Sequence, residues 1–160
     1  MRRFVLSLLA AAALLASSSM TVLGTSGAHF FKATASVSDS GALVATFDEA
    51  GVGQNQVNYT LSASASATYA CINGGGNHPK AANKASFNGP VSSPSIGFQP
   101  ENGRVKGSIS VGTLGSGSFS CPSGQTLVLA SVSYSNITLT DTTNNVTASI
   151  GSVSRTFINV

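Results

Sequence analysis

Residues 57–71 read VNYTLSASASATYAC, a stretch in which apolar side chains occupy every second position from Val57 to Cys71. Successive side chains of a β-strand point to opposite faces, whereas a helix would spread these apolar positions around its circumference. The stretch therefore predicts a long strand with one face in a hydrophobic core and the other in solvent. Cys71 falls on the core-facing side of this strand.

Further segments of the chain show the same alternation, and none shows a helical periodicity. Residues typical of turns separate these segments. About seven short strands arranged in this way predict an all-β fold, namely an antiparallel β-sandwich that is immunoglobulin-like in general architecture. The other segments predicted as strands are 31–37, 42–47, 105–111, 126–140 and 146–150.

Three details of these segments give sharper expectations. Phe31 has the same parity as the apolar residues of 33–37, so its side chain is expected to face the core. The apolar parity switches after Tyr134, which predicts a β-bulge near residues 135–136. Residues 48–56 are expected to form a loop.

The first 28 residues have the features of a secretory signal peptide. Two arginines precede an apolar run over 4–16, and Ser26 and Ala28 occupy the −3 and −1 positions of a small-x-small cleavage site. The run is shorter than the roughly 17–25 residues that a membrane span needs, and no second such run follows. We therefore expect residues 29–160 to be one secreted, extracellular domain without a membrane anchor.

The charge of the chain gives little indication of a charged partner. Two of the eight basic residues lie in the expected signal peptide, which leaves six basic and five acidic residues in 29–160. The six basic residues are dispersed along the sequence, a poor footprint for nucleic acid or anionic lipid. We expect neither as a partner, and we expect outward faces that are rich in serine and threonine hydroxyls.

The chain has two cysteines, Cys71 and Cys121. In an exported protein two cysteines most simply form one structural disulfide. Phe119 has the same parity as Cys121, and Pro122 favours an extended conformation before it, so Cys121 is also expected to face inward.

Residues 73–103 interrupt the alternation with three consecutive glycines and four of the five prolines. A connection of this length inside a compact domain is unusual and is often functional. The segment is either a crossover with one or two short edge strands or a binding loop whose base is held by the disulfide. On the second interpretation the candidate binding residues are Asn73, Asn77, His78, Lys80, Asn83 and Lys84.

The sequence contains few residues that could form a catalytic or metal site. His78 is the only histidine within 29–160 apart from His29 at its start, and no serine has the G-x-S-x-G spacing of a hydrolase nucleophile. The carboxylates lie mostly in predicted turns, and two paired cysteines leave too few ligands for zinc. We expect no enzymatic activity, no metal and no cofactor.

Three segments together resemble a group of small exported bacterial proteins, actinobacterial ones in particular, that are usually described as hypothetical secreted proteins. The segments are 71–84 (CINGGGNHPKAANK), 121–125 (CPSGQ) and 134–144 (YSNITLTDTTN). The resemblance covers most of 29–160 and implies a disulfide-bearing β-domain outside the cell, with no established activity. The separation of the cysteines is also similar to that of an immunoglobulin domain, although the chain has no tryptophan and Phe119 stands where the tyrosine corner would be.

The function we expect is that of a secreted, non-enzymatic binding or structural module, whose partner is an extracellular protein or an envelope component. The alternative is an inhibitor of an extracellular enzyme that presents residues 73–103 to its target. A hydrolase centred on His78 is a third interpretation.

Overall fold

The computed structural model describes residues 27–74 and 83–160, which form nine β-strands and no helix. Within these two ranges there is accordingly no helix that could cross a membrane. The strands are β1 (His29–Val37), β2 (Leu43–Ala50), β3 (Val57–Asn73), β4 (Lys84–Ser92), β5 (Ile96–Phe98), β6 (Arg104–Val111), β7 (Gln125–Asp141), β8 (Val146–Ile150) and β9 (Val153–Thr156).

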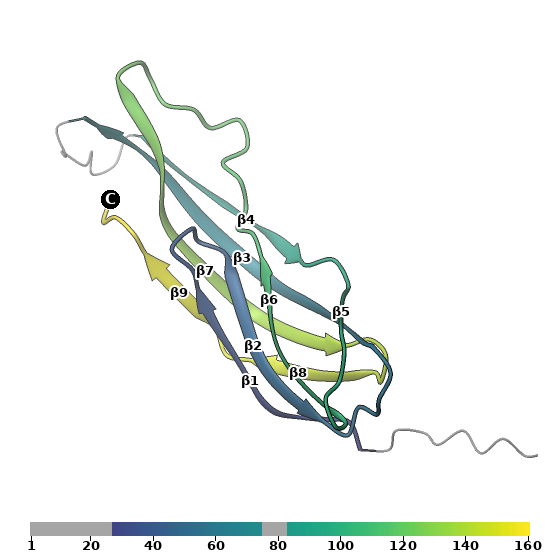
Figure 1. Cartoon of the computed structure of the whole chain (residues 1–160). Coiled ribbons are helices and arrows are strands. Elements are labelled where there is room, and N and C mark those ends of the chain that lie inside the picture. Colours follow the sequence, from purple (N-terminus) through teal and green to yellow (C-terminus); the bar gives the residue numbers. More distant parts are fainter. Residues whose placement is uncertain (1–26, 75–82) are drawn as a thin grey trace, which may run out of the picture.

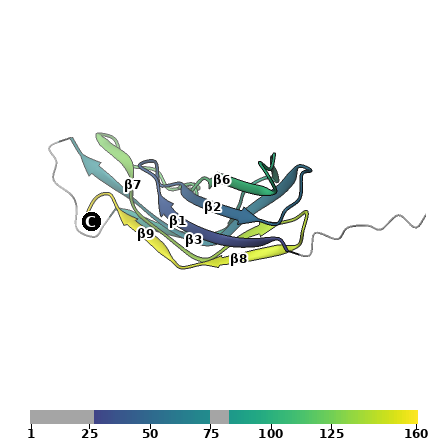
Figure 2. The same cartoon turned by 60° about the horizontal axis from the view of Figure 1, so that its bottom comes forward.

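The strands form two antiparallel sheets that pack face to face. A three-stranded sheet has the order β1-β2-β6, and a six-stranded sheet has the order β4-β3-β7-β8, with β5 paired to β3 and β9 paired to β7. Figure 2 shows β1, β2 and β6 as a layer over β3, β8 and β9. The predicted all-β sandwich is confirmed, with nine strands where about seven were expected.

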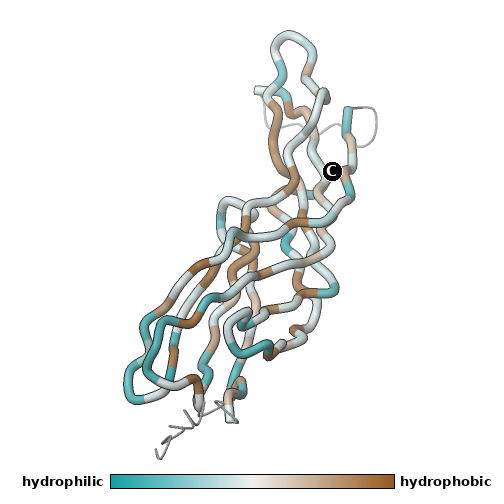
Figure 3. The backbone as a smooth tube through the Cα atoms, turned by 90° about the vertical axis from the view of Figure 1, so that its right-hand side faces the viewer, coloured by the Kyte–Doolittle hydropathy of each residue, from teal (hydrophilic) through white to brown (hydrophobic). Residues whose placement is uncertain are grey.

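The two longest strands, β3 and β7, pair with each other from Tyr59 to Asn73 of β3 and form the centre of the larger sheet (Figure 1). On β3 every second side chain from Val57 to Ala67 is buried, as the alternation predicts. Figure 3 shows the same alternation of apolar and polar positions along the strands. The apolar sides of both sheets thus meet in one core.

Two β-bulges interrupt the pairing of β7 with β3. Ser62 of β3 pairs with Thr138 of β7, and Ser64 pairs with Ser135. Between these pairs β7 has one residue more than β3, namely Asn136, which has a φ of 50°. This bulge confirms the one predicted from the switch in parity. The second extra residue of β7 is Ala130, which lies between the partners of Thr68 and Tyr69 of β3. Tyr69 is only half-buried.

A third bulge lies in β1 and corrects the expectation for Phe31. Phe30 pairs with Glu49 and Lys32 pairs with Asp48, so Phe31 is the extra residue between them. The side chain of Phe30 packs against the core, whereas Phe31 is 63% exposed. The prediction that Phe31 faces inward is therefore wrong, because the bulge shifts the parity of the strand at this point.

Two expected loops are shorter than the sequence suggested. Strand β2 continues to Ala50, so the connection to β3 begins at Gly51 and Glu49 lies in a strand. Within 73–103, residues 84–92 form the edge strand β4 and residues 96–98 form β5. For residues 84–98 the crossover with edge strands is thus the correct interpretation.

The core is aromatic at the end of the sandwich where β2 finishes. The rings of Phe47, Tyr59 and Phe98 lie with their centroids 4.6 to 5.6 Å apart. Gly107 of β6 leaves room for these rings, since a Cβ atom there would lie 2.7 Å from a ring carbon of Phe98 and 2.8 Å from one of Phe47. This packing fixes the position of β6 against β2 and β5.

Candidate functional site

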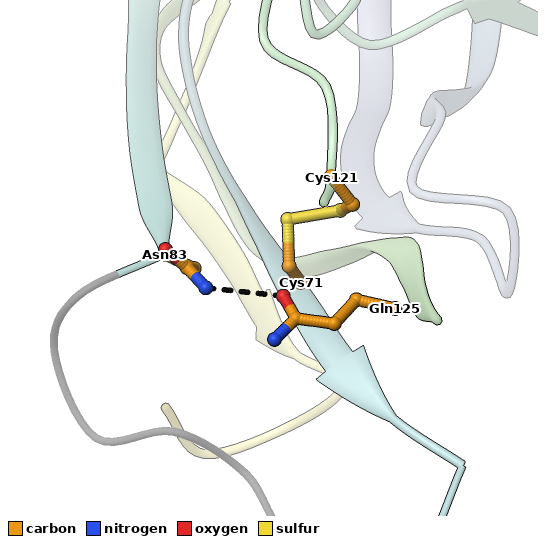
Figure 4. Close-up of a disulfide and its surroundings, with 4 residues drawn as sticks. All are labelled: Cys71, Asn83, Cys121 and Gln125. Carbon is orange, nitrogen blue, oxygen red and sulfur yellow. Dashed lines mark hydrogen bonds between the residues drawn. A yellow bond between two sulfur atoms is a disulfide. The ribbon is translucent and has the colours of Figure 1, made fainter. Parts of the chain in front are cut away.

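The predicted disulfide is present. The Sγ atoms of Cys71 and Cys121 are 2.07 Å apart, and their Cα atoms are 5.5 Å apart. Cys71 is fully buried, as predicted. Cys121 is half-buried and lies in the irregular connection 112–124, so it does not belong to a strand. The bond ties this connection to the end of β3 (Figure 4).

The base of the predicted binding loop is held next to the disulfide. The side-chain amide of Asn83 donates a hydrogen bond from Nδ2 to Oε1 of Gln125 at 3.0 Å (Figure 4). The backbone N–H of Cys71 donates to the carbonyl oxygen of Asn83 at 2.9 Å. Asn83 is therefore part of the framework at this end of the molecule.

The other candidate residues of this loop are not brought together by the described chain. Asn73 is the exposed last residue of β3, and the ammonium of Lys84 donates from Nζ to a backbone oxygen of Val160 at 3.4 Å. Three further candidates lie outside the described residues: Asn77, His78 and Lys80.

A second candidate site lies on the outer face of the three-stranded sheet. Asp48 of β2 pairs with Lys32 of β1 on one side and with Lys106 of β6 on the other. Side chains that are directly paired across antiparallel strands share one face of the sheet. We call this surface the charged face; its residues are Phe31, Lys32, Asp48, Arg104 and Lys106.

An ion pair of two hydrogen bonds organises the charged face. Arg104 donates from Nε to Oδ1 of Asp48 at 2.5 Å and from Nη2 to Oδ2 at 2.6 Å. The ammonium of Lys106 lies 3.9 Å from Oδ2 of the same carboxylate. The hydrogen bonds from Arg104 lower the pKa of Asp48, and they raise the pKa of Arg104. Asp48 therefore stays ionised at more acidic pH than a free aspartate would. Arg104 likewise stays protonated at more alkaline pH than a free arginine would.

The exposed ring of Phe31 holds the same guanidinium from another side. Cζ of Arg104 lies 5.1 Å from the centre of the Phe31 ring, within the range of a cation–π contact. The imidazole of His29 lies against the same ring, with 4.8 Å between the ring centres. The bulge that turns Phe31 outward thus supplies an aromatic support for Arg104 on the charged face.

The surface around the charged face is hollowed in two places, and Lys106 borders both. One hollow has a volume of about 510 Å³ and the other about 440 Å³. The first is lined by Gln99, Glu101, Asn102, Arg104 and Lys106. The second is lined by Lys32, Thr46, Phe47, Asp48, Lys106 and Gly107.

Directly behind the charged face lies a buried acidic cluster of Glu49, Tyr59 and Asp141, none of which is exposed to solvent. Asp141 is satisfied locally, since its Oδ1 accepts hydrogen bonds from the backbone N–H groups of Thr143 and Asn144. Among the described residues, neither carboxyl oxygen of Glu49 has a hydrogen-bond partner, and the hydroxyl of Tyr59 has none there either. Burial raises the pKa of Glu49 to about 7.

Sequence reasoning missed the charged face because its residues come from three strands. Lys32, Arg104 and Lys106 are dispersed along the sequence, and only the pairing of β1, β2 and β6 brings them to one surface. The available signal in the sequence was the aromatic residue Phe31 directly before Lys32. The parity of Phe31 in its strand, however, predicted that its ring faces the core.

Comparison with protein-family models, curated proteins and solved structures finds no match for this chain. In the described ranges, no group of three or more histidine, cysteine, aspartate or glutamate side chains could hold a metal ion. The fold and its site define the protein as a disulfide-bonded all-β sandwich with a charged, partly aromatic surface on its smaller sheet. The role of that surface has to be inferred from its own chemistry.

Proposed function

We propose that the protein is a secreted, non-enzymatic binding module and that the charged face contacts its ligand. The observation that supports this most is the concentration of charge. Of the five basic residues in the described part of the chain, three lie on this face. Exposed ion pairs contribute little to stability, so the fold itself gains little from gathering these side chains.

The ligand we propose is an acidic component of the cell envelope. Asp48 is already neutralised by Arg104, which leaves the ammonium groups of Lys32 and Lys106 to attract negative charge. Their strands lie on opposite sides of β2, about 10 Å apart. Arg104 is held by two contacts before any ligand arrives, and this preorganisation lowers the entropic cost of binding.

The proposal includes export by the predicted signal peptide and an immunoglobulin-like general architecture. The disulfide supports export, because such bonds persist in oxidising compartments outside the cytosol. Ala28 packs against the core, so a mature chain that starts at His29 would lose this contact. Sequencing the N-terminus of the exported protein would locate the cleavage.

A second candidate function is inhibition of an extracellular enzyme by the segment between Asn73 and Asn83. The observation that favours it is the anchoring of this segment's base, where Asn83 bonds to Cys71 and Gln125 beside the disulfide. Residues 84–92 and 96–98 form β4 and β5, so we restrict this second proposal to the segment before them. An inhibitor would recover a stoichiometric enzyme from culture medium, whereas an envelope module would sediment with the cells.

The proposed function can be tested by sedimentation of the exported protein with washed envelopes of the producing cells. We expect the Lys32→Gln/Lys106→Gln variant to bind at least tenfold more weakly, since each lost contact to a charged group costs about 1.5–3 kcal/mol and about 1.4 kcal/mol is a factor of ten in affinity. Added salt should weaken binding of the unchanged protein in the same way. Lys84→Gln, which removes a basic side chain of the larger sheet and leaves the charged face intact, should bind normally. Equal binding of the double variant would contradict the proposal.

A further inference from the structure

Glu49 is placed where a charged carboxylate is costly. Its side chain points into the core, opposite Phe30 of β1 and Val105 of β6 in the sheet, and it has no exposed surface. Within 27–74 and 83–160, both carboxyl oxygens lack hydrogen-bond partners. An ionised carboxylate buried in this way loses more in hydration than it regains from its neighbours, so the protonated form is favoured in the closed sandwich.

The groups that face Glu49 come from three other strands. Burial has the largest effect on its pKa, and the negative charge of Asp141 from β7 raises the pKa further. Tyr59 from β3 and the imidazole of His29 from β1 act in the opposite direction. Arg104 and Lys106, the basic residues of β6, point to the outer face of the sheet. They therefore do not neutralise the charge of the Glu49 carboxylate.

Glu49 is also linked to the charged face through β1. The neighbouring residue on β2, Asp48, points outward into that face, while Glu49 points inward beneath Phe30. Phe31 and Lys32 of the charged face follow Phe30 directly, and β1 is an edge strand of the smaller sheet. Because β1 has a hydrogen-bonded partner strand on one side only in the described part of the chain, its first residues can separate from β2 without unfolding the larger sheet.

We infer that ionisation of Glu49 releases the first residues of β1 from the sandwich, so that the charged face is complete only while this carboxyl is protonated. The opened state lets water reach the carboxylate and removes Phe31 and Lys32 from the surface that they share with Arg104. The consequence for ligand binding rests on the proposed function, whereas the opening of β1 does not. The protein would thereby respond to pH within the range around neutrality.

The opening can be measured by hydrogen exchange of the full exported protein between pH 5 and pH 8. Protection factors, corrected for the intrinsic exchange rates, should fall by about 70-fold for the amides of residues 30–34 over this range, given a carboxyl pKa near 4.5 when open and near 7 when closed. Amides in the centre of β3 and β7 exchange through global unfolding, so they serve as the internal control and should remain better protected than those of β1 at every pH.

The variant Glu49→Gln keeps the shape of the side chain and removes its ionisation. We expect its β1 protection to be independent of pH. Three results would overturn the inference: constant β1 protection in the unchanged protein, an unchanged pH dependence in Glu49→Gln, or β1 amides that are as well protected as those of β3 and β7. None of these readouts uses a ligand, so they separate this inference from the proposed function. If Glu49→Gln does not fold, the pH series on the unchanged protein still decides between local and global opening.

Discussion

The outer faces of the two sheets follow the same alternation but differ in chemistry. On the six-stranded sheet, hydroxyl groups from neighbouring strands pair with one another, as between Ser62 and Thr138 at 2.7 Å and between Thr68 and Ser86 at 2.9 Å. On the three-stranded sheet, the corresponding outward positions at one end form the charged face. The alternation decides where a side chain points, and the residue type at the outward position decides what the face can bind.

The two faces also differ in the polar groups that they present to a ligand. Paired hydroxyls are neutral and satisfy one another, so the hydroxyl face interacts weakly with charged ligands. The charged face keeps two lysine ammonium groups at the surface, and an acidic group lies directly behind it in the core. Experiments that change one face and leave the other intact therefore separate binding from folding.

The largest effect on stability is expected from a bond that belongs to neither face. Replacing both Cys71 and Cys121 by alanine should lower the free energy of unfolding by about 4 kcal/mol, because the disulfide closes a loop of roughly 50 residues. Urea unfolding under non-reducing conditions measures this loss. Envelope binding should survive wherever the variant remains folded, and a folded variant without binding would place the ligand site near the disulfide.

The pH dependence of stability should be the next largest effect. The folded-state pKa of Glu49, about 7, lies above its ordinary value of 4.5, so the stability it contributes is complete below pH 4.5 and is lost as the pH rises through 7. The free energy of unfolding should fall by about 2–3 kcal/mol between pH 5 and pH 8. Urea unfolding at four pH values tests this, and Glu49→Gln should flatten the dependence.

A smaller loss of stability should follow from filling the space that Gly107 leaves behind the charged face. Gly107→Val places atoms against the rings of Phe47 and Phe98 and should destabilise the protein by about 1–3 kcal/mol. Ser108→Val, one residue further along the same strand, points outward and should change stability by less than about 0.5 kcal/mol. Thermal unfolding of both variants gives the comparison; similar losses would mean that the inner packing is not the cause.

The smallest effect should come from the hydroxyl face. Thr68→Val keeps the shape of the side chain and removes its hydrogen bond to Ser86, which should change stability by about 0.5 kcal/mol or less because both groups are accessible to water. Envelope binding should be unchanged. A clear loss of binding in this variant would shift the ligand site to the larger sheet.

Much of the fold could be predicted from local patterns. The alternation of 57–71 gave the long strand and the inward direction of Cys71, and the switch in parity after Tyr134 gave the bulge at Asn136. Both inferences rest on a signal contained within one strand. Phe31 was placed wrongly because the apolar alternation of β1 is regular only after the bulge. The parity of this strand alone therefore could not show that a bulge is present.

The candidate site was less predictable, because it depends on pairing between distant strands. Lys32, Asp48 and Lys106 are far apart in sequence and become neighbours only through the register of β1, β2 and β6. Glu49 was assigned to a loop because a strand that ends in charged residues has the composition of a turn. The part of the predicted binding loop around His78 lies outside the described residues and stays a prediction.

The central claim is that the charged face contacts an acidic ligand, and a charge-matched pair of variants tests it most directly. Lys106→Glu and Lys84→Glu change the net charge equally, but only the first lies on the charged face. The measurement is the affinity of each purified protein for washed envelopes at one salt concentration. We expect Lys106→Glu to weaken binding by about tenfold or more and Lys84→Glu to leave it within about twofold. Equal losses in both variants would show that net charge alone governs binding and would contradict the claim.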